Sequence, residues 1–412
     1  MALALVLTGC GGGSVAAPTF TPKPQVQGPL PNDVQDQLKA AVQRAMAASG
    51  SSGAIVGVWA PWSGSWVVGL GTVAPGDKTP VKTDMSFRIA DVTRMMTCDV
   101  LYALADRDIV KLDDKIPTYV SGVPDLSDVS LLDLCDGTAG IGSSASTVMS
   151  AWLNNPDREW EPKELASYGL GQSRTPAHTA YRDSDAGYLL LGLALERATG
   201  RTAAQLIREY VTSPLGLSST SLPGSTADAP QPAPALDGFY LPQAANGAYA
   251  CDKPADITVA SASMGYTASG VVSTIDDLGR YAQAAAVQAL RVKDTPKRFG
   301  KPLAVASGAP SWYQATGGAY LVGSLIGQHG AIPGYLTAAY SDPASGFTVA
   351  VVLNDSSAGG GIAGDLAWEL SAIASKAPPA KGRKAPAFAL PFTADDRSKS
   401  VDAAAICHPA QG

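Results

Sequence analysis

The sequence has few charged residues, no excess of basic ones and few histidines. Asp, Glu, Lys and Arg make up 16% of its 412 residues, against roughly 25% in an average soluble protein. With 30 basic and 36 acidic residues the formal net charge is -6, so the chain lacks the basic excess that nucleic acid or anionic lipid attracts. The three histidines, His178, His329 and His408, do not have the spacing of a zinc site. We therefore expect neither nucleic acid nor zinc as a ligand.

Long apolar runs are missing too, apart from a short one at the N-terminus. No other stretch approaches the 18 consecutive apolar residues that predict a membrane-spanning helix. The N-terminal run closes on Leu7-Thr8-Gly9-Cys10, which resembles the bacterial lipobox, where a signal peptidase cuts before a cysteine that carries lipid. Residues 1–9 are then the remnant of a signal peptide, and residues 10–31, rich in Gly and Pro, are a lipidated cysteine with a flexible linker. We expect an exported protein that Cys10 anchors to the outer face of the bacterial cell membrane.

The composition indicates a folded protein. Hydrophobic residues make up 46% of the chain, which is ample for a large core and excludes a disordered protein. A Pro/Ala/Lys-rich stretch begins after residue 375, so we expect one domain over 32–375 and a poorly ordered C-terminal tail over 376–412, unless Cys407 pins it back. Besides Cys10 the cysteines number four, which predicts two disulfides with three possible pairings in an exported chain; they are Cys98, Cys135, Cys251 and Cys407.

Hydrophobic periodicity and turn residues predict helices and strands at both ends of the domain around a mostly helical middle. The first helix is expected to start at a cap on Asn32 or Asp33, and the helix over 201–211 to be closed by Pro214. This order predicts an α/β (α+β) sandwich, in which both chain ends form one antiparallel sheet and an all-α region is inserted. The predicted helices cover 33–48, 91–106, 186–199, 201–211, 273–286 and 362–375, and the predicted strands cover 53–60, 65–71, 318–327, 336–340 and 347–353.

Four blocks of sequence point to a family. They are Phe87-Arg88-Ile89-Ala90-Asp91-Val92-Thr93-Arg94, Gly137-Thr138-Ala139-Gly140-Ile141, Tyr181-Arg182-Asp183-Ser184-Asp185-Ala186-Gly187-Tyr188 and Gly327-Gln328-His329-Gly330-Ala331-Ile332-Pro333-Gly334-Tyr335. In this order they resemble F-R-I-G-S-V-T-K, H-T-S-G-L, F-x-Y-S-N-x-G-Y and G-H-T-G-x-x-P-G-Y of the serine β-lactamase-related family, which includes class C β-lactamases, D-alanyl-D-alanine carboxypeptidases and esterases. The resemblance covers nearly the whole domain. It implies a β-lactamase/DD-peptidase-like fold and a cleft derived from one that recognises D-Ala-D-Ala-like peptides or β-lactams.

The positions of the family's catalytic residues are all substituted. Acyl transfer in this family needs a serine nucleophile and a lysine three residues later, where this chain has Asp91 and Arg94. An arginine stays protonated and cannot act as a base. The tyrosine and asparagine of the next motif fall on Asp183 and Asp185, and the Lys or His of the last motif falls on Gln328. We therefore expect a catalytically inactive member that binds or scaffolds at the cell wall.

Two other functions remain open. A divergent serine hydrolase would use Ser184 with His329 as its base, and Thr93 is a second hydroxyl in the motifs. Asp91 is a poorer nucleophile, because Arg94 would hold it as a paired anion. The third possibility is a structural partner of another envelope protein, whose identity the sequence does not reveal.

The replaced residues also allow different uses of the cleft. Asp91, Asp183 and Asp185 with Arg94 form either an ion-pair network that fills an unused cavity or a site for a cationic or amine-bearing ligand. Three carboxylates also suit Ca²⁺ or Mg²⁺, although their proximity in an alignment is a weak metal signal, and we expect no metal and no cofactor. The expected ligand is a peptidoglycan peptide or another small molecule. The binding cleft is predicted to comprise Asp91, Arg94, Asp183, Asp185, Gln328, His329 and Gly330.

The resemblance also implies a disulfide pairing. Cys135 replaces a family leucine in a helix that packs close to the helix of Cys98 in relatives. We therefore expect Cys98 to pair with Cys135, and Cys251 with Cys407.

Overall fold

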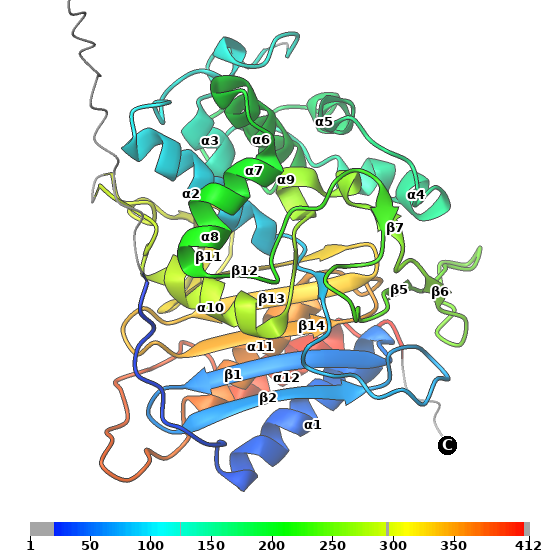
Figure 1. The fold of residues 1–412 in the computed structure, drawn as a ribbon. Coiled ribbons are helices and arrows are strands. Elements are labelled where there is room, and N and C mark those ends of the chain that lie inside the picture. Colours follow the sequence, from blue (N-terminus) through cyan, green and yellow to red (C-terminus); the bar gives the residue numbers. More distant parts are fainter. Residues whose placement is uncertain (1–19, 124, 294–295, 408–412) are drawn as a thin grey trace, which may run out of the picture.

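An eight-stranded antiparallel sheet forms the centre of the molecule, with helices on both faces (Figure 1). The computed structural model describes residues 20–123, 125–293 and 296–407. The strand order is β2-β1-β14-β13-β12-β11-β10-β9, so the N-terminal hairpin pairs with the last strand of the chain. This confirms the predicted sheet built from both chain ends. The strands are β1 (Gly53–Ala60), β2 (Gly64–Gly71), β9 (Leu303–Ala304), β10 (Tyr313–Thr316), β11 (Ala319–Val322), β12 (Leu325–Ile332), β13 (Tyr335–Ser341) and β14 (Thr348–Leu353).

Helices from the two chain ends cover one face of the sheet, and an inserted helical region covers part of the other (Figure 1). The first group consists of α1 (Asn32–Ser49), α11 (Gly361–Ala374) and α12 (Ala394–Ala403). The other face and the inserted region hold α2 (Val92–Asp106), α3 (Leu131–Asp136), α4 (Ala145–Asn154), α5 (Pro162–Leu170), α6 (Asp185–Thr199), α7 (Ala203–Ile207), α8 (Ser213–Leu215), α9 (Tyr266–Ser269) and α10 (Ile275–Ala286). Short two-stranded pairs join β3 (Phe87–Arg88) to β8 (Val272–Ser273), β4 (Ala227–Asp228) to β7 (Ala260–Ser261), and β5 (Phe239–Tyr240) to β6 (Ala255–Asp256).

The central strand β14 shows why these residues form a sheet with two covered faces. All six of its residues are buried. Val349 and Val351 pack into the core shared with α1 and α11, while Ala350 and Val352 pack into the core shared with α2 and α10. Because side chains alternate between the faces of a strand, a strand covered on both sides must be apolar throughout.

Three local predictions are wrong. Residues 318–327 are a hairpin of β11 and β12 and not one strand, because Gly323 adopts a left-handed conformation (φ 63°) and reverses the chain there. Pro214 does not close the helix over 201–211, which continues through a π-helical turn into α8 and ends at Gly216. Pro214 lies in the last turn of this continuous helical run, directly after the π-helical turn. The residue before α1 is Pro31, and no side chain caps that helix.

The two terminal segments lie against the domain. The backbone N–H of Leu30 donates to the Ser65 carbonyl over 3.0 Å, and the backbone N–H of Ser65 donates to the Gly28 carbonyl over 3.0 Å. Residues 28–30 therefore run beside β2, and this part of the expected linker is not free. The segment after residue 375, expected as a tail, contains α12, which packs on α1 and α11 and buries Val401. The predicted lipidation site at Cys10 lies outside the described residues. Within those residues, no helix has both the length and the apolar character to cross a bilayer.

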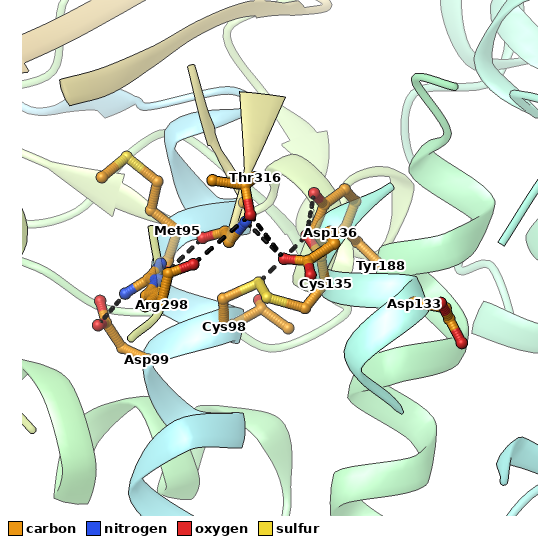
Figure 2. Close-up of a disulfide and its surroundings, with 12 residues drawn as sticks. Met95, Cys98, Asp99, Asp133, Cys135, Asp136, Tyr188, Arg298 and Thr316 are labelled. Carbon is orange, nitrogen blue, oxygen red and sulfur yellow. Dashed lines mark hydrogen bonds and ion pairs between the residues drawn. A yellow bond between two sulfur atoms is a disulfide. The ribbon is translucent and has the colours of Figure 1, made fainter. Parts of the chain in front are cut away.

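Both disulfides pair as predicted. Cys251 and Cys407 are joined with 5.9 Å between their Cα atoms, and this bond holds the segment after α12. Cys98 and Cys135 are joined with 5.6 Å between their Cα atoms, and this bond links α2 to α3 behind the cleft described below (Figure 2).

A buried arginine, Arg298, lies beside the Cys98–Cys135 disulfide (Figure 2). Arg298 forms an ion pair with Asp99 of α2 and donates to the carbonyl oxygens of Met95 over 2.7 Å and Gly317 over 2.8 Å. The hydroxyl of Tyr281 donates to the same Asp99 carboxylate over 2.6 Å. The network joins α2 and α10 to the turn before β11, so it fixes the helical region on the sheet.

We expect Arg298→Met to lower the free energy of unfolding by about 3–5 kcal/mol, because it leaves the Asp99 carboxylate buried without its cation. Urea unfolding followed by circular dichroism measures this loss. The exposed Arg383→Met serves as the control and is expected to change stability by less than about 0.5 kcal/mol. A loss below about 1 kcal/mol for Arg298→Met would show that the pair is not needed for stability.

Candidate functional site

A cleft of about 280 Å³ lies between the start of α2, α4, the start of α6 and β12. It contains most of the residues that the sequence singles out: Asp91, Arg94, Asp183, Asp185, His329 and Gly330. A larger depression of about 680 Å³ runs along α7 and α8, but none of those residues lines it. The other residues of the cleft are Ser143, Ala145, Met149, Trp152, Leu189, Met264, Ala268, Ser269, Tyr320, Ala331, Gly360 and Gly361.

The start of α2 places the first two predicted residues. Ala90 has a left-handed backbone (φ 47°), which turns the chain sharply so that Asp91 stands at the helix start. Arg94 lies one turn later, and its Nη2 is 3.2 Å from Oδ2 of Asp91. The same guanidinium forms an ion pair with Asp183 and lies 5.1 Å from the ring centre of Tyr188. Arg94 therefore bridges two of the three predicted carboxylates.

Burial changes the titration of this ion pair. It raises the pKa of Asp91 to about 7, against the effect of the Arg94 charge, and the carboxylates of Asp183 and Asp185 raise it further. Burial opposes the charge of Arg94 as well, but the carboxylates of Asp183 and Asp91 hold its pKa above its ordinary value. Arg94 thus stays a cation and has no free electron pair with which to accept a proton.

Ser184 and Asp185 are neighbours at the start of α6, but only Asp185 lines the cleft. Ser184 caps the helix: its hydroxyl donates to the Gly142 carbonyl over 2.8 Å and accepts from the Gly187 N–H over 3.2 Å. It is buried and does not line the cleft. Asp185 does line it, and its Oδ1 accepts from the Ser144 N–H over 2.8 Å and from the Ser143 hydroxyl.

Strand β12 supplies the last motif. Gln328 is buried, accepts from the His329 N–H over 2.9 Å and donates to the Gly318 carbonyl over 3.1 Å. Its amide therefore joins β12 to the turn before β11, close to Gly327, where the pairing of these strands ends, and it does not line the cleft. Gly330 is required by Asp91, because a Cβ atom at this position would lie 2.3 Å from the Asp91 carboxyl.

His329 has a partner other than the one expected. Its Nδ1 lies 2.6 Å from the Tyr340 hydroxyl, and its ring packs between Tyr320 and Trp368, with ring centres 4.9 and 5.5 Å away. Burial lowers the pKa of His329 to about 4, so the imidazole is neutral near pH 7. Among the described residues, no hydrogen bond joins His329 to Ser184.

Sequence reasoning missed part of the cleft. Ser143 lies two residues after the Gly137–Ile141 block, and its place near a family motif is the one sequence signal that points to it. Met149 and Trp152 are three residues apart on α4, so they share a helix face, and both line the cleft. Tyr320 comes from β11 and Ser269 from α9. No local pattern predicts these contacts, since they depend on how distant elements pack.

The carboxylates do not form a metal site in this structure. Over residues 20–123, 125–293 and 296–407, no group of three or more His, Cys, Asp and Glu side chains is arranged to hold a metal ion. Arg94 occupies the space between Asp91 and Asp183 that such an ion would need. The arrangement fits an ion-pair network with one additional carboxylate, that of Asp185.

Comparison with known proteins identifies the family. The family model described as Beta-lactamase matches residues 38–372. The D-alanyl-D-alanine-carboxypeptidase/endopeptidase AmpH of Escherichia coli is 31% identical over 166 residues, which cover 37% of this chain and 40% of that protein. Penicillin-binding protein 4* of Bacillus subtilis is 24% identical over 146 residues, covering 35% of this chain and 32% of that one. The chain thus matches less than half the length of these curated relatives.

Solved structures share the fold over more of the chain. A D-stereospecific amidohydrolase from Streptomyces sp. has a TM-score of 0.65 at 21% identity, covering 77% of this chain and 94% of that one. The octameric penicillin-binding protein homologue from Pyrococcus abyssi has a TM-score of 0.68 at 18% identity, covering 88% and 80%. At such identities the likeness concerns the fold alone.

The raised pKa of Asp91 predicts a pH dependence of stability. Between its ordinary value of 3.8 and about 7, the folded protein keeps a proton on this carboxyl that the unfolded chain has released. The contribution of Asp91 to stability is therefore complete at low pH and is lost as the pH rises toward 7. We expect the stability of the wild type, relative to Asp91→Asn, to fall over this range by at most about 1.4 kcal/mol per pH unit.

Urea unfolding of both proteins at several pH values measures this difference. The comparison cancels the other titrating groups, including His329, whose lowered pKa acts in the opposite direction. Parallel stability curves for wild type and Asp91→Asn would contradict the prediction.

Proposed function

Because this chain belongs to the Beta-lactamase family, we propose that it is an exported, lipid-anchored member that no longer performs acyl transfer. Its cleft binds a small cell-wall ligand instead. The Escherichia coli relative is a D-alanyl-D-alanine carboxypeptidase and endopeptidase, which makes peptidoglycan peptides the first ligands to consider.

The ion pair at the start of α2 carries this proposal. A family enzyme would have a serine nucleophile and a lysine base at these positions, but here Asp91 and Arg94 face each other over 3.2 Å. The cation also binds Asp183, at the position of the family tyrosine. The positions of the family's serine, lysine and tyrosine therefore all take part in ion pairs. A paired carboxylate is a weak nucleophile, and a guanidinium is not a base.

Other features support a place in the cell envelope. Leu7-Thr8-Gly9-Cys10 resembles a lipobox, in which the cysteine carries the lipid. The two disulfides suit an oxidising compartment outside the cytoplasm. Both observations favour attachment through Cys10 at the outer face of the cell membrane.

One observation favours a second candidate, a divergent serine hydrolase. The hydroxyl of Ser143 lines the cleft and donates to the carboxylate of Asp185. Ser143 is thus a better nucleophile candidate than Ser184, whose hydroxyl is engaged with backbone groups. Against this candidate, His329 is bonded to Tyr340, so it is not the base of either serine in this structure.

Intact-mass spectrometry of the purified protein with a β-lactam and with a fluorophosphonate tests the proposal. We expect no mass gain with either reagent, because His329 is bonded to Tyr340 and the group that accepts from Ser143 is a carboxylate, which is a weak base near pH 7. An active class C β-lactamase treated in parallel shows that the reagents are competent.

A stable mass gain on any serine would overturn the proposal. Peptide mapping and the variants Ser143→Ala and Ser184→Ala would then identify the nucleophile. Loss of the adduct in Ser143→Ala alone would establish the hydrolase with Ser143 as its reactive group.

A further inference from the structure

Three buried polar atoms of residues that line the cleft have no hydrogen-bond partner within the described part of the chain. They are Oδ2 of Asp185, Nε1 of Trp152 and Nε of Arg94. The other nitrogens of Arg94 already bind Asp91 and Asp183, whereas among the described residues Asp185 has no cation and the Trp152 indole has no hydrogen bond. Asp185 and Trp152 are only 6% and 4% exposed. Buried polar groups without a partner are rare in folded proteins, because each loses its hydration without replacement. These two side chains therefore indicate a ligand that satisfies both.

The Asp185 carboxylate is held so that its free oxygen has a fixed position. Oδ1 accepts from the Ser144 N–H and the Ser143 hydroxyl, and the residue begins α6. Among the described ion pairs Asp185 has no cation, because Arg94 is bound to Asp91 and Asp183. The missing partner of Oδ2 is thus a hydrogen-bond donor with positive charge.

Trp152 requires the opposite kind of group. An indole N–H is a donor only, so its partner is an acceptor such as a carbonyl oxygen. Met149, one helical turn before Trp152, lines the cleft together with Leu189 and Met264. These side chains offer an apolar wall to the rest of the ligand.

We propose that the cleft binds a compound with a free primary ammonium group, a neighbouring carbonyl oxygen and an apolar side chain, such as an amino-acyl group with a free amino end. The ammonium binds Oδ2 of Asp185, the carbonyl oxygen accepts from Nε1 of Trp152, and the side chain lies against Met149, Leu189 and Met264. This inference rests on the proposed function, since it names the ligand class of that binding cleft.

The charge balance of the cleft supports this ligand class. Even when Asp91 is protonated, the carboxylates of Asp183 and Asp185 outnumber the single arginine, and the neutral His329 adds no positive charge. Such a site repels a ligand carboxylate and attracts an ammonium. The cleft therefore selects the amino end of a peptide-like ligand.

Isothermal titration of the purified protein with four small probes tests the proposal. The probes are D-leucinamide, L-leucinamide, N-acetyl-leucinamide, which lacks the ammonium, and 3-methylbutylamine, which lacks the carbonyl. We expect at least one leucinamide enantiomer to bind, and its acetylated form to bind about tenfold more weakly or worse, since a charge-assisted hydrogen bond is lost. Failure of both leucinamides to bind, or equal binding of the acetylated form, would overturn the proposal.

Two variants separate the two recognition sites. Asp185→Asn keeps the size of the side chain but removes its charge, and we expect it to weaken both leucinamide and 3-methylbutylamine about tenfold or more. Trp152→Phe removes the N–H and leaves a smaller aromatic ring, and we expect it to weaken leucinamide by about threefold to tenfold more than it weakens 3-methylbutylamine, which has no carbonyl to accept from the N–H. Asp395→Asn, a matched change on the exposed α12, is expected to change neither affinity.

The variants give clear contrary results as well. Unchanged affinity for leucinamide in Asp185→Asn would overturn the ammonium site, and an equal loss for both probes in Trp152→Phe would overturn the carbonyl contact. Thermal melting shows whether each variant is folded. If Asp185→Asn does not fold, the affinity of folded Trp152→Phe for the two probes decides whether the proposal holds. A covalent adduct or release of leucine from bound leucinamide would contradict the proposed function alone and leave the ammonium site intact.

Discussion

Helix α2 is buried along almost its whole length although it carries three charged residues. Other parts of the structure supply an oppositely charged partner for each of them. Arg94 pairs with Asp91 and Asp183, Asp99 pairs with Arg298, and Asp106 pairs with Arg291. A buried charge without a partner costs several kcal/mol, so each partner has to be brought to α2 when the chain folds. Apart from Asp91, which directly precedes α2, the partners come from the segment before α6 and from the segment after α10. The helix thereby joins the inserted helical region to the sheet.

The same requirement shapes the cleft. In the family motif the start of this helix presents a serine nucleophile, whereas here it presents an ion pair. Among the described residues the ion pair leaves one carboxylate, Asp185, without a cation, and the neutral His329 is bonded to Tyr340. These features support the proposal that the cleft binds a ligand and does not cleave it. The disulfide between Cys98 and Cys135 fixes the back of this site by joining α2 to α3.

Most of the fold follows from local sequence patterns. The apolar runs of β1 and β14 predict strands, and Gly200 in its left-handed conformation ends α6 where the sequence indicates. The errors arise where local patterns compete with long-range contacts. A short apolar stretch around Gly323 reads equally well as one strand or as a hairpin, and only pairing with neighbouring strands decides between them. The segments 20–31 and 376–407 are held by contacts with distant residues, which composition does not show.

In the candidate site, too, the sequence determines some features and the tertiary structure decides the others. The sequence alone determines that no serine and no lysine occupy the family's first motif, because chemical identity does not depend on conformation. It also indicates that Asp91, Arg94, Asp183 and Asp185 approach one another. Tertiary structure decides the rest: Arg94 bridges two carboxylates, and the Ser184 hydroxyl turns to the backbone. Among the described residues, Oδ2 of Asp185 and Nε1 of Trp152 are left without a hydrogen-bond partner. These outcomes depend on side-chain direction and on burial, which are set by the packing of elements far apart in the chain.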